Sequence, residues 1–204
     1  MIRPDALARL LTDHDDGPAR PVVLDVRWRV GGPPARPDHE AGHVPGAVFL
    51  DLDTALADPP GAGGRHPLPD PDRLRGTLAQ AGAGAGSAVL AYDDADGAVA
   101  ARAWWSLRWL GWPADRVRVL DGGWAAWRAG GHPVTAEPSR PRPAHPVAAT
   151  PAAMPVLDAD GAARVAGGGV LLDARAPARY RGDTEPIDAR AGHVPGARNA
   201  PFAE

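Results

Sequence analysis

The sequence contains no cysteine among its 204 residues. This absence excludes disulfides, thiolate metal sites and a cysteine nucleophile within these residues, because each of them needs a thiol. Lysine is also absent, so arginine supplies all 22 basic residues. The formal net charge is −3, which leaves no basic field to attract nucleic acid. We therefore expect no nucleic-acid partner.

Long apolar runs are missing as well. No stretch approaches the ~18 apolar residues that a membrane span requires. The N-terminal segment 1–11 is short and amphipathic and contains Asp5, unlike a secretory signal. Hydrophobic and charged contents of 44% and 23% are typical of a globular protein. We expect a cytoplasmic protein that has no membrane partner.

Two segments of the chain occur twice, in the same order. Val-Val-Leu-Asp-Val-Arg at 22–27 returns as Val-Leu-Leu-Asp-Ala-Arg at 170–175. Ala-Gly-His-Val-Pro-Gly-Ala at 41–47 returns unchanged at 191–197. Both pairs lie about 150 residues apart, which indicates a duplicated structural unit.

The position of the second copy predicts the domain organisation. Residues 1–135 are expected to form one complete domain, large enough to bury its own core. Residues 136–151 contain five prolines and no apolar period, so they are expected to form an extended linker. Residues 152–204 are expected to be the N-terminal part of a second domain, cut short soon after its repeat.

Apolar runs alternate with helical patterns along the chain, which predicts an α/β fold with a mainly parallel sheet. The strands are expected at 22–26, 47–50, 88–92, 117–120 and 170–173. The helices are expected near the N-terminus with Pro4 in the first turn, at 71–81 with Asp70 as cap, from Gly97 to about Leu110, at 124–129 and at 157–166. Residues 31–37 are expected to form a loop.

Several motifs together resemble the rhodanese family in its tandem-domain form. They lie at 24–27, 42–47, 64–69 and 120–124 with Trp127, and again at 173–175, 179–182 with Glu185 and Pro186, and 192–197. The resemblance covers nearly the whole chain in the right order. Tandem members include thiosulfate and 3-mercaptopyruvate sulfurtransferases. It implies a rhodanese-like parallel sheet flanked by helices.

The resemblance also implies where the active cysteine stands, which is on the loop after the central strand and just before a helix. Backbone N–H groups and the helix N-terminus favour a thiolate there. Asp93 occupies this position in the first domain, and three carboxylates in 93–96 would repel thiosulfate. We therefore expect the first domain to be non-catalytic and the cysteine of the second domain to lie beyond residue 204.

For the full-length protein the resemblance implies transfer of sulfane sulfur from a small anionic donor, thiosulfate or 3-mercaptopyruvate, to cyanide or a thiol through a cysteine persulfide. Arg179 would bind the donor, and Asp173 and Arg175 would support the pocket. Mercaptopyruvate-type members carry a second arginine where this chain has Asp188, which favours thiosulfate. No metal or organic cofactor is implied. The alternative is a non-catalytic binding or regulatory module.

Other patterns favour structural roles. Residues 39–43 fit the zinc motif H-E-x-x-H, but Gly42 and Pro45 argue against the helix that it needs. At the matching positions the second copy has Ala189 and Arg190, so we expect a structural turn. The pairs Asp25–Arg27 and Asp173–Arg175 are expected to be structural ion pairs, and the six tryptophans between 104 and 127 are expected to serve packing.

Overall fold

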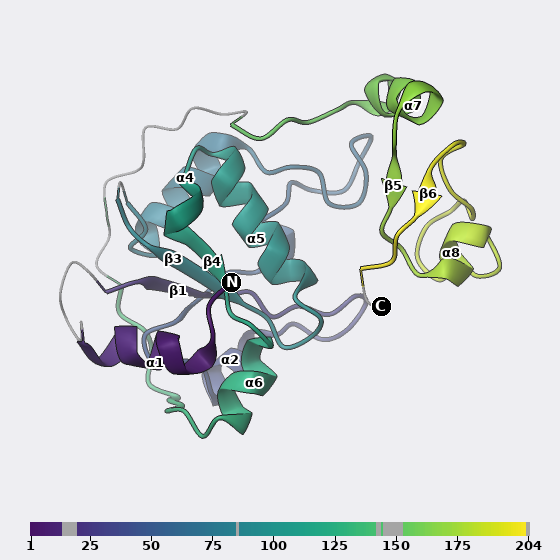
Figure 1. Cartoon of the computed structure of the whole chain (residues 1–204). Coiled ribbons are helices and arrows are strands. Elements are labelled where there is room, and N and C mark those ends of the chain that lie inside the picture. The colour runs from purple at the N-terminus through teal and green to yellow at the C-terminus, as the bar shows by residue number, and fades with distance from the viewer. Residues whose placement is uncertain (14–19, 85, 142–143, 145–152, 203–204) are drawn as a thin grey trace. The chain divides into compact units, whose positions relative to one another are not determined.

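The structure, a computed structural model, describes residues 1–13, 20–84, 86–141, 144 and 153–202 (Figure 1). The chain divides into two compact units, Met1–Met154 and Pro155–Glu204. Most of the predicted proline-rich linker lies outside the described residues. The domain boundaries predicted at 135 and 152 remain predictions.

The first unit is built on a four-stranded sheet in the order β2-β1-β3-β4, with every neighbouring pair parallel. Its strands are β1 (Val22–Asp25), β2 (Val48–Phe49), β3 (Val89–Tyr92) and β4 (Val117–Val119). The central strand β3 is buried along its whole length, as expected of a strand that is covered on both faces. The predicted α/β fold with a parallel sheet is confirmed.

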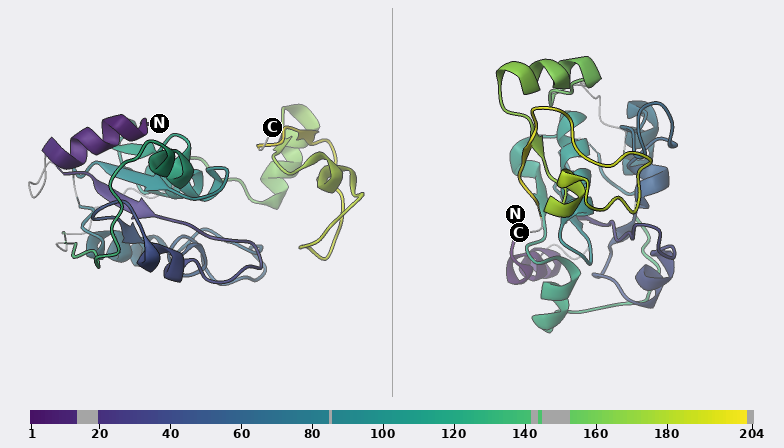
Figure 2. Two further views of the ribbon diagram at one scale, coloured as in Figure 1. Left: turned by 90° about the horizontal axis from the view of Figure 1, so that it is seen from below. Right: turned by 90° about the vertical axis from the view of Figure 1, so that its right-hand side faces the viewer.

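Helices cover both faces of this sheet (Figures 1 and 2). Successive strand side chains point to opposite faces, so Leu24 and Val23 enter two different cores. One core packs against α4 and α5, and the other packs against α1 and α6. The helices of this unit are α1 (Pro4–Asp13), α2 (Arg36–Ala41), α3 (Leu52–Ala55), α4 (Pro71–Gln80), α5 (Ala98–Trp109) and α6 (Gly123–Ala129), with a 3-10 turn at Ala114–Arg116.

Helix ends follow the local chemistry of the sequence. Asp70 caps α4 as predicted, because its carboxylate accepts hydrogen bonds from the N–H groups of Asp72 and Arg73. Asp51 caps the short helix α3, which was not predicted. Gly111 follows α5 with φ 98°, a backbone conformation that favours glycine.

The prediction for the segment before the first G-H-V-P-G turn was partly wrong. The loop expected at 31–37 ends early, because α2 begins at Arg36 with Pro37 in its first turn. His39 and Glu40 therefore lie in a helix, which the reasoning from Gly42 and Pro45 excluded. Gly42 does stop that helix, and it does so before His43.

The second unit contains α7 (Ala159–Gly168), β5 (Leu172–Asp173), α8 (Pro177–Arg181) and β6 (Arg198–Asn199). The two strands form a parallel pair. Several of its large apolar side chains remain open to solvent: Val170, Leu172, Val194 and Phe202. In both units, the helices of the described residues fall short of the length and apolarity that a bilayer crossing requires.

Exposure of these apolar groups predicts that the second unit of the 204-residue chain opens more readily than the first. Trypsin should therefore cut first at the arginines between 175 and 198, and a fragment containing the first unit should accumulate. Mass spectrometry over a digestion time course measures the order of cleavage. Cuts after Arg73 in α4 or Arg108 in α5 at the same rate would contradict the prediction.

Candidate functional site

A buried carboxylate lies at the C-terminal end of β1. Asp25 is 0% exposed, and its two oxygens accept hydrogen bonds from Arg27 Nε and Nη2, the latter at 2.6 Å. Its Oδ2 also lies 2.8 Å from His39 Nδ1 and accepts a hydrogen bond from Tyr92 Oη at 2.8 Å. Burial alone would raise the pKa of Asp25, but the hydrogen bonds from these partners outweigh it and hold the pKa below its usual value.

Arg27 connects this carboxylate to the pocket in front of the sheet. Its Nη2 also donates to the carbonyl of Gly42 at 2.9 Å, and its guanidinium lies 4.9 Å from the centre of the Trp124 ring. Burial lowers the pKa of Arg27, but the adjacent Asp25 more than compensates and raises it. The predicted ion pair is present and joins β1 to the turn after α2.

The second unit repeats this geometry almost atom for atom. Arg175 Nη2 lies 2.6 Å from Asp173 Oδ2 and donates to the carbonyl of Gly192 at 2.7 Å. The hydrogen bonds from Arg175 lower the pKa of Asp173, and the Asp173 carboxylate raises the pKa of Arg175. We call this Asp–Arg–Gly arrangement the brace. The support of a pocket that the resemblance implied for Asp173 and Arg175 remains a prediction.

The loop after β3 forms an anion cradle that is already filled. The Asp93 carboxylate is 1% exposed and accepts four backbone hydrogen bonds. Oδ1 accepts from Ala95 and Gly97 at 3.1 Å, and Oδ2 accepts from Val99 at 3.1 Å and Ala100 at 3.0 Å. These N–H groups belong to the loop and to the first turn of α5, where the helix dipole also favours a negative charge.

The sequence predicted that three carboxylates in this loop would repel an anionic substrate, but their contacts do not support that explanation. Asp94 Oδ2 lies 2.5 Å from Arg29 Nη2, and Asp96 accepts a hydrogen bond from the N–H of Ala98. Two of the three charges are thus engaged elsewhere. The loop excludes an external anion because Asp93 itself takes the N–H donors.

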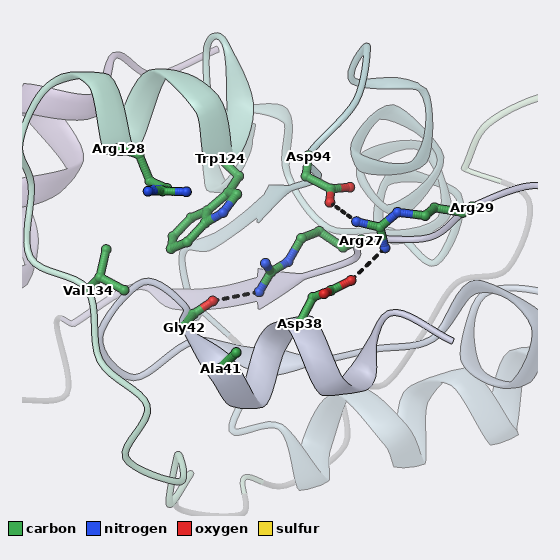
Figure 3. A pocket seen from close by; sticks show the side chains of 9 residues that line it. All are labelled: Arg27, Arg29, Asp38, Ala41, Gly42, Asp94, Trp124, Arg128 and Val134. Atoms are coloured by element: carbon green, nitrogen blue, oxygen red, sulfur yellow. Dashed lines mark hydrogen bonds and ion pairs between the residues drawn. The ribbon is translucent and has the colours of Figure 1, made fainter. Parts of the chain in front are cut away.

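A pocket of about 510 Å³ opens in front of the first sheet (Figure 3). Three guanidinium groups, two carboxylates and an apolar wall line it: Arg27, Arg29, Arg128, Asp38, Asp94, Ala41, Gly42, Trp124 and Val134. Arg29 is held between Asp38 at 2.8 Å and Asp94 at 2.5 Å. Burial raises the pKa of Asp94, although Arg29 and Arg27 counteract part of this rise.

Arg179, the predicted donor-binding residue, lies in α8 and is engaged by two carboxylates. Its Nη2 lies 2.7 Å from Glu185 Oε1 and 2.9 Å from Asp188 Oδ2, and its Nε donates to Glu185 Oε2 at 3.2 Å. The backbone N–H of Asp188 and the Arg179 guanidinium lower the pKa of Glu185 to about 2. A fixed and oriented guanidinium of this kind suits an anion with two oxygens.

Ring stacking shows which helical residues of the two units correspond. In the first unit, the His43 ring stacks on the His39 ring with centroids 3.9 Å apart, and His43 Nδ1 lies 2.7 Å from the His39 carbonyl oxygen. In the second unit, the His193 ring stacks on the Tyr180 ring at 3.8 Å, and His193 Nδ1 lies 2.7 Å from the Tyr180 carbonyl oxygen. The counterpart of His39 is therefore Tyr180. The expected match to Ala189 was wrong, because the second unit has extra residues between α8 and its turn.

This correspondence bears on Arg179. Arg179 precedes Tyr180 as Asp38 precedes His39, and Asp38 lines the pocket of the first unit. Arg179 thus occupies a helix position whose counterpart faces a pocket. Its binding role remains a prediction.

One histidine–carboxylate pair of a kind used in acid–base catalysis was not identified from the sequence. His66 Nε2 lies 3.0 Å from Asp53 Oδ1, and Trp28 Nε1 donates to Asp53 Oδ2 at 2.8 Å. A histidine oriented by a carboxylate is a common general base. His66 belongs to the motif at 64–69, but Asp53 lies outside every motif, so the pattern did not point to the pair.

The H-E-x-x-H pattern does not build a metal site. The two rings stack face to face, and one nitrogen of each is committed, in His39 to Asp25 and in His43 to the carbonyl of His39. Across the part of the chain that the structure describes, no group of three His, Asp or Glu side chains is arranged to hold a metal ion.

Comparison with known proteins adds to this geometry. The family described as "Rhodanese-like domain" matches residues 4–130. The chain is 46% identical over 189 residues to a "Probable 3-mercaptopyruvate sulfurtransferase" of Pseudomonas aeruginosa, covering 90% of this chain and 66% of that protein. It is 34% identical over 191 residues to a thiosulfate sulfurtransferase of Rattus norvegicus, covering 88% and 62%. It thus spans less than two thirds of the length of both relatives.

A solved structure shares the fold. The 3-mercaptopyruvate sulfurtransferase from Leishmania major superposes with a TM-score of 0.82 at 29% identity, over 98% of this chain and 54% of that one. The fold predicted from the motifs is therefore confirmed.

Removal of the Asp93 carboxylate should destabilise the first unit. Asp93→Ala leaves four N–H groups without their acceptor, and we expect a loss of about 3 kcal/mol in the free energy of unfolding. Asp96→Ala is the matched control, because it removes a single hydrogen bond to Ala98 and should cost about 1 kcal/mol. Urea denaturation measures both. Equal effects of the two substitutions would contradict the proposed cradle.

The Arg179–Glu185 pairing predicts a pH dependence in the second unit. The backbone N–H of Asp188 and the Arg179 guanidinium hold the pKa of Glu185 at about 2, below its ordinary value of 4.5, so these bonds stabilise the unit above pH 4.5 and are lost as the pH falls toward 2. Carboxyl-detected NMR titration should show this midpoint, and in Arg179→Gln the midpoint should move up toward the ordinary value. An unchanged midpoint in the variant would show that Arg179 does not contribute.

Proposed function

Since this chain belongs to the rhodanese-like domain family, we propose that it is the N-terminal portion of a tandem sulfurtransferase. The relatives that it matches are sulfurtransferases, and the match continues through both units. The observation that carries the proposal is the repeated Asp–Arg–Gly brace, together with the loop after β3 in the first unit, whose N–H groups are occupied by Asp93. The first unit then serves as a non-catalytic partner of the second.

The proposed reaction runs in two steps through a cysteine outside these 204 residues. The thiolate attacks the outer sulfur of thiosulfate, the sulfur–sulfur bond breaks, and sulfite leaves with the electron pair. The resulting persulfide then gives its outer sulfur to cyanide, which yields thiocyanate and restores the thiolate. A thiol acceptor would take the same sulfur, and 3-mercaptopyruvate is the alternative donor. No metal or organic cofactor enters this scheme.

In this scheme Arg179 binds the anionic donor. Glu185 is 6% exposed and Asp188 is 42% exposed, so Asp188 is the partner that a donor would replace. Glu185 would stay in place and keep the guanidinium oriented. Asp173 and Arg175 would hold the turn at Gly192 behind it.

A second candidate function is a non-catalytic module that binds a partner or a small molecule. The filled Asp93 loop and the lack of a thiol in these residues favour it. The two candidates differ in one measurable respect, because only the sulfurtransferase forms thiocyanate.

The test uses the full-length protein that contains this chain. With cyanide and either thiosulfate or 3-mercaptopyruvate, the wild-type protein should form thiocyanate. Arg179→Gln should raise the KM for the donor about tenfold, as expected for loss of about 1.4 kcal/mol of binding. Arg181→Gln is the control, because Arg181 is an exposed neighbour that pairs with Asp183. Absence of thiocyanate with both donors would overturn the proposal in favour of the binding module.

A further inference from the structure

The pocket of the first unit is lined by charged side chains that can bind a ligand, although Asp93 occupies the N–H groups of the loop after β3. It lies in front of the carboxyl ends of the strands, where open α/β sheets bind their ligands (Figure 3). Nothing in the sulfur transfer proposed above uses this pocket.

The three arginines of the pocket differ in how their charges are compensated. Arg27 is paired with Asp25, and Arg29 is paired with both Asp38 and Asp94. Arg128, in the last turn of α6, forms none of the ion pairs or hydrogen bonds found among the described residues. Figure 3 shows its side chain beside Trp124 at the pocket wall. Arg29 offsets only one of its two carboxylates, so the charges of the three arginines and of Asp25, Asp38 and Asp94 balance. Arg128 is nevertheless the guanidinium of the pocket whose N–H groups have no partner among the described residues, so they are available to an external anion.

The wall next to Arg128 is apolar and rigid. The Trp124 ring stacks on the buried Tyr92 ring at a centroid distance of 5.9 Å, and the Arg27 guanidinium carbon lies 4.9 Å from the centre of the Trp124 ring. These two contacts fix the orientation of the indole. Val134 and Ala41 complete this wall. A ligand with a charged head and a short apolar body would use both the guanidinium and the wall, whereas an inorganic anion would use only the guanidinium.

We propose that this pocket binds a small organic carboxylate, with its carboxylate on Arg128 and its apolar body against Trp124 and Val134. The carboxylate can receive two parallel hydrogen bonds from the guanidinium. The carboxylates of Asp38 and Asp94 form their ion pairs with Arg29 and not with Arg128, whose N–H groups are left to a ligand. This inference goes beyond the proposed sulfur transfer and does not depend on it.

The test is an NMR titration of the 204-residue chain at constant ionic strength, with benzoate as the probe. Formate has the carboxylate without the aromatic ring, and benzyl alcohol has the aromatic ring without the charge. We expect saturable shifts of the Trp124 indole and Gly42 amide signals with benzoate, at a Kd in the millimolar range. Formate should bind at least fivefold more weakly, and benzyl alcohol should give no saturable shift.

Two variants and a control locate the binding. Arg128→Gln should weaken benzoate at least fivefold, whereas Arg118→Gln, which removes an exposed arginine on β4 outside the pocket, should leave it unchanged. Val134→Ser should weaken benzoate but not formate. The absence of saturation, equal effects of the two arginine variants, or equal affinity for formate and benzoate would each overturn the proposal. These outcomes leave the thiocyanate assay unaffected, so the two hypotheses fail separately.

Discussion

The buried carboxylate of Asp25 is the constraint on which the first unit depends. A charge without access to water must be compensated by hydrogen bonds, or its desolvation destabilises the fold by several kcal/mol (about 3–5 when one partner of a buried pair is lost). Arg27, His39 and Tyr92 supply these bonds from the segment after β1, from α2 and from β3. Arg27 also contacts residues outside this cluster, because it donates a hydrogen bond to the carbonyl of Gly42 and lies over the Trp124 ring. The position of α2 and the shape of the pocket therefore follow from one ionised group.

The two units show which part of this arrangement is local. Asp173, Arg175 and Gly192 reproduce the brace of the first unit within 20 residues of chain and beside only a two-stranded sheet. The brace therefore needs no complete domain. The contact that Tyr92 adds to Asp25 comes from β3, and a corresponding strand is absent from the described part of the second unit. Accordingly, Asp173 is only part-buried whereas Asp25 is 0% exposed.

Much of the fold could be predicted from the sequence because it is encoded locally. Apolar runs located the strands, Asp70 located the start of α4, and the repeated motifs led to the fold of the first unit. The sequence could not show that α2 includes His39, because the partner that holds that histidine, Asp25, lies in another element. A constant offset also misplaced the counterpart of His39, since the extra residues after α8 shift the register.

The candidate site was less predictable, because its chemistry depends on contacts between side chains. The position of Asp93 in the loop could be inferred from the order of the motifs, but the direction of its carboxylate could not. Likewise the motif identified Arg179, whereas its two carboxylate partners became visible only in three dimensions. The Asp53–His66 pair belongs to the same class, because it joins residues from separate segments.

The filled cradle has a consequence for the binding of anions from solution. The Asp93 carboxylate is attached by a single methylene to the backbone that binds it, so its effective concentration at the four N–H groups greatly exceeds that of a dissolved anion. Because this carboxylate is covalently attached, its concentration at the N–H groups does not fall when the protein is diluted. A small anion in solution would be unable to displace it. The loop after β3 is thus closed to anions from solution.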